Sequence, residues 1–144
     1  MKAKLVLLLA GGIVMIALPA RAHHSFAAEF DVNQPITLQG TLTKMEWVNP
    51  HGWIYVDVKG PDGQVKNWAV EAVAPNTLLR RGLRKEDFPI GSEIVVKGYK
   101  AKNGQPVANG RTVTFVNGRN FFLGSEGAGA PNDAADKPAP TNPY

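Results

Sequence analysis

The sequence predicts a small all-β barrel of five to six strands, with one short helix between strands three and four. From Ile36 onward, apolar and polar residues alternate with the period of two that strands require. Clusters of Gly, Pro, Asn and Asp separate these alternating runs. The period changes around Leu78 and Leu79, where a short helix is expected. The chain has no cysteine, so its core must hold the fold without disulfides.

The N-terminal segment has the pattern of a secretory signal peptide. Lys2 and Lys4 precede an apolar run from Leu5 to Leu18, and small residues follow at Ala20 and Ala22. A transmembrane anchor is the competing interpretation, but the run is shorter than the roughly 20 apolar residues that span a bilayer. We therefore predict a signal peptide at residues 1–22, cleavage after Ala22, and a periplasmic or secreted protein without a membrane span.

Cleavage at this position changes the charge of the protein. It removes Lys2, Lys4 and Arg21 but no acid, so 16 basic residues against 12 acidic residues become 13 against 12. The basic character of the whole chain is therefore largely a property of the removed segment. Since an electropositive footprint is the first requirement of nucleic-acid binding, no nucleic-acid partner is expected.

The elements follow one another in a simple order. Strands are expected from Thr37 to Val48, Trp53 to Val58, Val65 to Glu71, Glu93 to Lys100 and Arg111 to Val116, with a short closing strand at Phe121-Phe122-Leu123. Gly40 interrupts the first strand and predicts a bulge or a coiled course. Gly60-Pro61-Asp62-Gly63 predicts a hairpin. The helix is expected to begin at Asn76 or an earlier residue and to stop at Gly82. Basic residues near its end, explained as a solvated helix terminus, are Arg80, Arg81, Arg84 and Lys85.

Three strands in a meander, a helix and two more strands are the order of an OB-fold barrel. A long first strand interrupted by a glycine suits this fold, because in it the first strand must curl enough to pair at both ends. An open sandwich is the alternative, and an immunoglobulin pattern is disfavoured by the small number of strands. We expect one OB-like domain over residues 23–123. A Gly/Ala/Pro-rich tail, residues 124–144, is expected to be disordered.

The candidate chemistry lies in three histidines. Cleavage after Ala22 would create a chain that begins His23-His24, and an α-amino group beside an imidazole is a nitrogen chelate that suits Cu(II). His51 lies in the tight Asn49-Pro50-His51-Gly52 corner and would add a further nitrogen. We predict a copper site at His23, His24 and His51, in which one of the two terminal histidines ligates the metal and the other does not. Glu29, Asp31 and Asp57 are candidate acceptors for the second ring N–H of a ligating histidine.

Plainer interpretations exist for each of these features. The two terminal histidines would then form a solvated chain end, and His51 would cap its turn. Aromatic residues around the corner could line a ligand face or pack in the core; this predicted face consists of Met45, Trp47, Trp53 and Tyr55. No catalytic motif appears, and carboxylates such as Glu46, Asp57 and Glu71 are spread over surface-like positions, so we do not expect an enzyme. The alternative function is a non-catalytic periplasmic module that binds a protein partner or a small envelope ligand.

Several runs resemble a family of exported bacterial proteins classed as a domain of unknown function. These runs are His-His-Ser-Phe from His23, the stretch from Gly40 to Ile54 around Trp-Val-Asn-Pro-His-Gly-Trp, the stretch from Pro75 to Leu83, and Gly-Ser-Glu-Ile-Val-Val-Lys-Gly-Tyr from Gly91. The resemblance covers His23 to about Phe122 and implies export, but no settled activity.

A looser similarity is to periplasmic OB-barrel copper chaperones, which use His, Met and a nearby Trp to hold copper. The similarity implies roles for Met45, Trp47, His51 and Trp53. Such chaperones use more than one thioether, whereas the expected mature chain has one methionine, because Met1 and Met15 leave with the signal.

Overall fold

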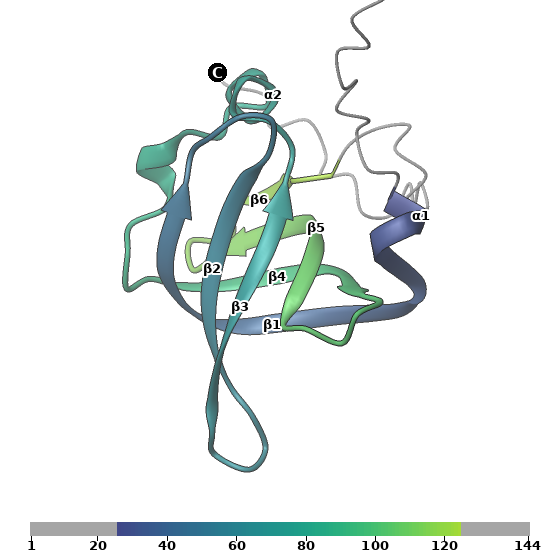
Figure 1. The fold of residues 1–144 in the computed structure, drawn as a ribbon. Coiled ribbons are helices and arrows are strands. Elements are labelled where there is room, and N and C mark those ends of the chain that lie inside the picture. Colours follow the sequence, from purple (N-terminus) through teal and green to yellow (C-terminus); the bar gives the residue numbers. More distant parts are fainter. Residues whose placement is uncertain (1–25, 125–144) are drawn as a thin grey trace, which may run out of the picture.

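The computed structural model describes residues 26–124, which form a mostly β structure (Figure 1). The elements are α1 (Phe26–Glu29), β1 (Phe30–Glu46), β2 (Gly52–Lys59), β3 (Val65–Ala72), α2 (Pro75–Arg80), the 3-10 turn η1 (Lys85–Asp87), β4 (Glu93–Ala101), β5 (Val107–Phe115) and β6 (Asn120–Phe122). The predicted signal peptide, residues 125–144 of the predicted tail, and His23 and His24 lie outside the described residues.

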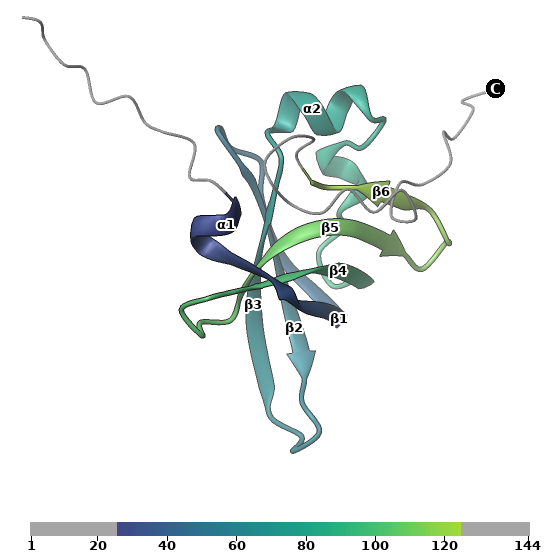
Figure 2. The same ribbon diagram turned by 90° about the vertical axis from the view of Figure 1, so that its right-hand side faces the viewer.

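Six strands pair in the order β3-β2-β1-β4-β5-β6. All of these neighbours are antiparallel, and β3 makes an additional parallel pairing with β5 over Ala69–Val107, Val70–Ala108 and Glu71–Asn109. The hairpin of β2 and β3 projects beyond the other strands at one end, whereas α2 and β6 lie at the other end (Figure 2). The predicted β class and strand number are therefore confirmed.

The 17-residue strand β1 organises the sheet because its two halves pair with different strands. Its first part pairs with β4 as far as Thr41, and its second part pairs with β2 from Thr41 onward. Figure 1 shows β1 running alongside β4 and then turning up beside β2. At the turning point, a Cβ on Gly40 would lie 2.0 Å from the backbone oxygen of Asp57. Glycine is therefore required where the three strands meet, and the pairing shifts register between Leu42 and Lys44.

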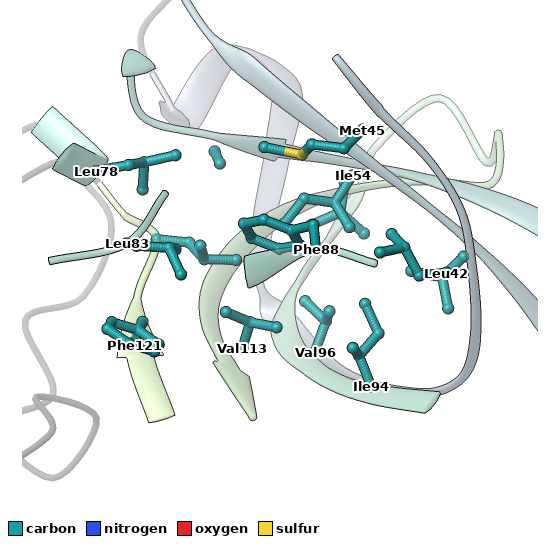
Figure 3. Packing of buried hydrophobic residues seen from close by; sticks show 14 of the residues in the cluster. Leu42, Met45, Ile54, Leu78, Leu83, Phe88, Ile94, Val96, Val113 and Phe121 are labelled. Carbon is teal, nitrogen blue, oxygen red and sulfur yellow. The ribbon is translucent and has the colours of Figure 1, made fainter. Parts of the chain in front are cut away.

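The main core fills the space between the strands and the segment that follows β3 (Figure 3). Leu42, Ile54 and Val56 of the first two strands are completely buried, as their alternation with polar neighbours predicts. Leu78 and Leu83, from α2 and the turn after it, are equally buried and cover one end of the core. Full burial of such side chains contributes about 1.5–3 kcal/mol each.

A second, smaller core attaches the N-terminal end of the described chain. Phe26 and Phe30 pack their rings 5.7 Å apart, and Phe26 meets Tyr99 edge-on with ring centroids 5.5 Å apart. Lys102 adds two hydrogen bonds, from its backbone N–H to the Glu29 carbonyl (2.9 Å) and from Nζ to the Ala27 carbonyl (2.6 Å). α1 is therefore held against the end of β4.

The helical segments differ from the expectation of a single short helix. α2 begins with Pro75 at its first position and Ala74 as the preceding cap, and Gly82 follows it with φ of 79°. Pro is pre-organised for a first helical position, since its missing N–H would have no partner there. α1 and η1 were not predicted, because neither has enough residues to show a helical period.

The basic cluster after α2 is more than the solvated helix end that the sequence suggested. The Arg81 guanidinium donates hydrogen bonds through Nη1 to the carbonyls of Phe122 and Gly124, both at 2.9 Å. It also stacks over the Phe122 ring, 4.8 Å from the centroid. Arg81 thus attaches the end of β6 to the end of α2, and charge-assisted bonds of this kind stabilise a fold by about 1.5–3 kcal/mol.

Asp87 gives the fold a pH dependence of known sign. Partial burial would raise its pKa, but the hydrogen bonds from the Arg84 backbone N–H and the Arg119 guanidinium, both 2.7 Å, outweigh burial and lower the pKa. The stabilisation is therefore complete above the ordinary aspartate pKa and is lost as the pH falls through the lowered value. We expect Asp87→Asn to cost about 1 kcal/mol at neutral pH, and the cost to vanish in acid. Urea unfolding at several pH values measures this, with Glu86→Gln, an exposed carboxylate on the same turn, as the control.

Candidate functional site

His51 and Glu71 come together where the β1–β2 corner meets the end of β3. The β2–β3 ladder pairs Gly52 with Ala72 and Trp53 with Glu71, and the Gly52 N–H donates to the Val73 carbonyl at 3.3 Å. Since His51 directly precedes this ladder, its ring lies beside the Glu71 side chain. The Nδ1 of His51 contacts Oε1 of Glu71 as an ion pair or a hydrogen bond, according to the protonation of the imidazole. The preceding Asn49–Pro50 peptide bond is cis.

Glu71 is a buried carboxylate in a strand, with only 9% of its surface exposed. Burial raises its pKa because it penalises the charged form, and the nearby Glu29 adds to the rise. The His51 imidazole and a hydrogen bond from the Asn109 side chain act in the opposite direction. Asn109 reaches Glu71 because the parallel pairing of β3 with β5 sets the two residues opposite each other. The carboxylate is therefore fixed between two strands and the corner.

The acceptor for His51 differs from the residues that the sequence suggested. Asp57 accepts a hydrogen bond from Nδ2 of Asn67 (2.7 Å), and Asp31 accepts from the Asn33 N–H (2.9 Å) and the Gln34 side chain. Glu71, expected on the surface, is the buried partner instead. The hairpin turn offered the missing signal, because counting back from Lys59 opposite Val65 sets Trp53 beside Glu71.

The four residues of the predicted ligand face do not gather on one side of the sheet. Met45 lies opposite Ile54 and is buried in the main core, as Figure 3 shows. Trp53 and Tyr55 alternate with Ile54 and therefore point to the outer face of β2. The Tyr55 hydroxyl donates to Oε2 of Glu46 at 3.1 Å. Trp47 is half-buried and packs against the core. Among the predicted copper ligands, His51 thus lies in a polar site beside Glu71. Among the predicted lining residues, Met45 packs in the core.

The N-terminal end of the described chain approaches the same site. α1 carries Glu29, which is close enough to Glu71 to act on its pKa, and α1 begins at Phe26, three residues after His23. Within residues 26–124, His, Asp and Glu side chains form no cluster of three or more that could hold a metal ion. His23 and His24 lie outside this range.

The comparisons with known proteins give one match. No curated protein matches the chain, and no solved structure matches it, so the similarity to copper chaperones remains an expectation. Among the described helices, none has the length and apolar character to cross a membrane. The sequence model of a family of unknown function, DUF6152, matches residues 10–110, which is most of the chain and includes the His51 corner. The chain therefore belongs to this family of unknown function.

Proposed function

We propose that this is an exported periplasmic protein that binds or carries copper through the N-terminus of its processed chain and His51. The observation that carries the proposal is the pair formed by His51 and Glu71. Metal-bound imidazoles donate their other ring N–H to a carboxylate or carbonyl, which fixes the ring and raises its basicity. A ring held by Glu71 at Nδ1 coordinates a metal through Nε2. The proposed role is binding, without catalysis.

The attachment of α1 supports a contribution from the N-terminus. Phe26 is 4% exposed and is fixed against Tyr99, while Glu29 acts electrostatically on Glu71. A chain spans at most about 3.6 Å per residue, so the backbone of His24 is within about 7 Å of Phe26 and that of His23 within about 11 Å. An amino terminus with an imidazole, joined by a second imidazole, makes a nitrogen-rich ligand set of the kind that Cu(II) prefers.

The strand pairings support the finer description of the fold as an OB-like barrel. β1 pairs with both β2 and β4, and β3 with both β2 and β5, so the pairings lead from strand to strand and back to the first. Closure would remove the exposed sheet edges that invite aggregation. Slow hydrogen exchange of the Ala69 N–H, which donates to the Pro106 carbonyl at 3.0 Å, would agree with closure. Exchange at the rate of an open edge would contradict it.

A Cu(II) titration followed by EPR tests the copper proposal. The protein must be exported and processed through its own signal, and intact mass must identify His23 as the first residue. We expect one tight equivalent with a nitrogen-rich spectrum. A matched protein with one alanine added before His23 has the same fold and the same His51 but a displaced amino group. Equal copper affinity and identical spectra for the two proteins would rule out the terminal chelate.

The second candidate is a non-catalytic module that binds a protein partner or a small envelope ligand. It is favoured by a lysine-lined pocket whose lining includes neither His51 nor Glu71. Such a module would be indifferent to an alanine added before His23. The titration above therefore separates the two candidates.

A further inference from the structure

A small pocket lies where the start of β3, the end of β4 and the turn from β4 to β5 meet. Its volume is about 220 Å³. The residues that matter for its chemistry are Lys66, Trp68, Lys100, Lys102, Gln34 and Gln105. The turn is fixed in place because the Ala69 N–H donates to the Pro106 carbonyl at 3.0 Å, and Gly104 adopts a φ of 75°. The pocket is thus built from paired strands and an ordered turn.

The lining of this pocket is strongly cationic. Its lining includes three lysines and no acidic residue, although the chain has 12 acidic residues beside its 16 basic ones. Lys102 keeps its place because Nζ donates to the Ala27 carbonyl, and an ammonium group has two further N–H donors. Asp31 is a neighbouring acid, and the hydrogen bonds that it accepts from Asn33 and Gln34, followed by the charge of Lys102, lower its pKa. Three lysines without an acidic residue in the lining give the pocket the charge that attracts an anion.

We propose that this pocket binds the phosphate monoester group of a small ligand. A phosphate monoester carries nearly two negative charges at neutral pH and offers three acceptor oxygens, which suits three lysines and two amide side chains. Lysine binds phosphate as a compact point charge without demanding bidentate geometry. The pocket is smaller than the roughly 300 Å³ at which sites for whole organic ligands begin, so it takes the charged group and leaves most of the ligand outside.

Trp68 gives the pocket an apolar wall on which the attached part of the ligand can lie. The side chain is half-buried and packs against the main core, so its position is fixed. A ring bonded to the phosphate oxygen would contact the indole as it leaves the pocket. Ligands with a ring next to the phosphate should therefore bind more tightly than inorganic phosphate, by about tenfold for a contact of about 1.4 kcal/mol.

Titration with three small anions, followed by the amide NMR shifts of Gly104 and Gln105 and the indole of Trp68, tests this site. The probes are phenyl phosphate, inorganic phosphate and benzoate. We expect saturable binding in the order phenyl phosphate, then inorganic phosphate, with benzoate weakest because it is a monoanion. Absence of saturable phosphate binding, or binding of benzoate as tight as that of phenyl phosphate, would overturn the proposal for a soluble ligand.

Vesicles distinguish a soluble ligand from a lipid headgroup that carries the same group. Phosphatidylcholine vesicles with and without phosphatidic acid supply this arm of the experiment. Co-sedimentation that depends on phosphatidic acid would identify a lipid source, whereas saturable binding of phenyl phosphate alone would identify a soluble one. Failure of both arms rejects the site.

Lysine variants test whether phenyl phosphate binds in this pocket. Lys66→Gln and Lys100→Gln, each exposed and therefore compatible with folding, should weaken phenyl phosphate binding by about tenfold each. Lys59→Gln removes the same charge from an exposed position at the end of β2 that does not line the pocket, and should change affinity little. Equal losses in all three variants would mean a diffuse charge effect and would contradict a specific site. The outcome is independent of copper, since none of these residues touches His51.

Discussion

Replacing Gly40 with alanine should lower the free energy of unfolding by about 3 kcal/mol or more, at the upper end of what overpacking costs. The added Cβ would lie 2.0 Å from the Asp57 carbonyl oxygen, 2.9 Å from its carbon and 3.2 Å from the Val58 Cα. All three atoms belong to the backbone, so no side chain can move aside. The β1 and β2 strands would have to separate at the point where β1 leaves β4.

Urea unfolding measures the loss, and Gly52→Ala is the matched control. Gly52 is also a buried strand residue, but a Cβ there would meet its nearest atom, the Val73 carbonyl oxygen, at 3.5 Å, an ordinary contact. We expect this control to change stability by less than about 1 kcal/mol. A Gly40→Ala protein as stable as the control would show that β1 does not follow the curled course described above.

His51→Ala should weaken Cu(II) binding to the processed protein by more than about 100-fold. Loss of the carboxylate or carbonyl partner of a ligating histidine commonly costs 10–100-fold in metal affinity, and loss of the ligand itself costs more. Glu71→Gln should therefore fall between the wild type and His51→Ala, at about 10–100-fold, because an amide oxygen still accepts the ring N–H but carries no charge. Competition titrations against a chelator of known Cu(II) affinity give these ratios.

Glu46→Gln is the control for the two copper variants. Glu46 is a carboxylate opposite Trp53 in the same sheet, but it bonds Lys44 and Tyr55 instead of His51. Its substitution should leave copper affinity unchanged. Circular dichroism shows whether each variant is folded. If folded His51→Ala retains the affinity of the wild type, His51 is not a ligand and the terminal chelate would have to act alone.

Most of the strands could be predicted from the sequence because each carries its own local signal. The alternation of Ile54 and Val56 with polar neighbours defines β2, and the Gly60 to Gly63 turn fixes how β2 pairs with β3. The interruption at Gly40 was also correctly associated with a coiled strand. These features depend on residues close together in the chain, where the alternation of apolar and polar side chains is enough to predict a strand.

The remainder depended on contacts between distant segments. α1 has four residues, too few to show a helical period of apolar side chains. It is stabilised by the contact of Phe26 with Tyr99, more than 70 positions later in the chain. Glu71 appeared exposed because strand alternation places it beside Trp53 on the outer face. Its burial comes from β5, which pairs in parallel with β3 and brings Asn109 against it. A parallel neighbour so far along the chain leaves no local pattern, so the burial of Glu71 and its contact with Asn109 could not be predicted.

Because α1 packs on residues near the end of β4, the first described residues to be synthesised are not the first to become ordered. Residues 26–30 are synthesised before every other described element, yet the surface on which they rest is supplied by Tyr99, Ala101 and Lys102. That surface exists only after β4 has paired with β1 and β5, and the long loop between the partners must first be closed. The first described residues to be made are thus among the last to settle. If the proposed copper site exists, ligands from the amino terminus and His51 would therefore come together only after α1 has settled on the end of β4.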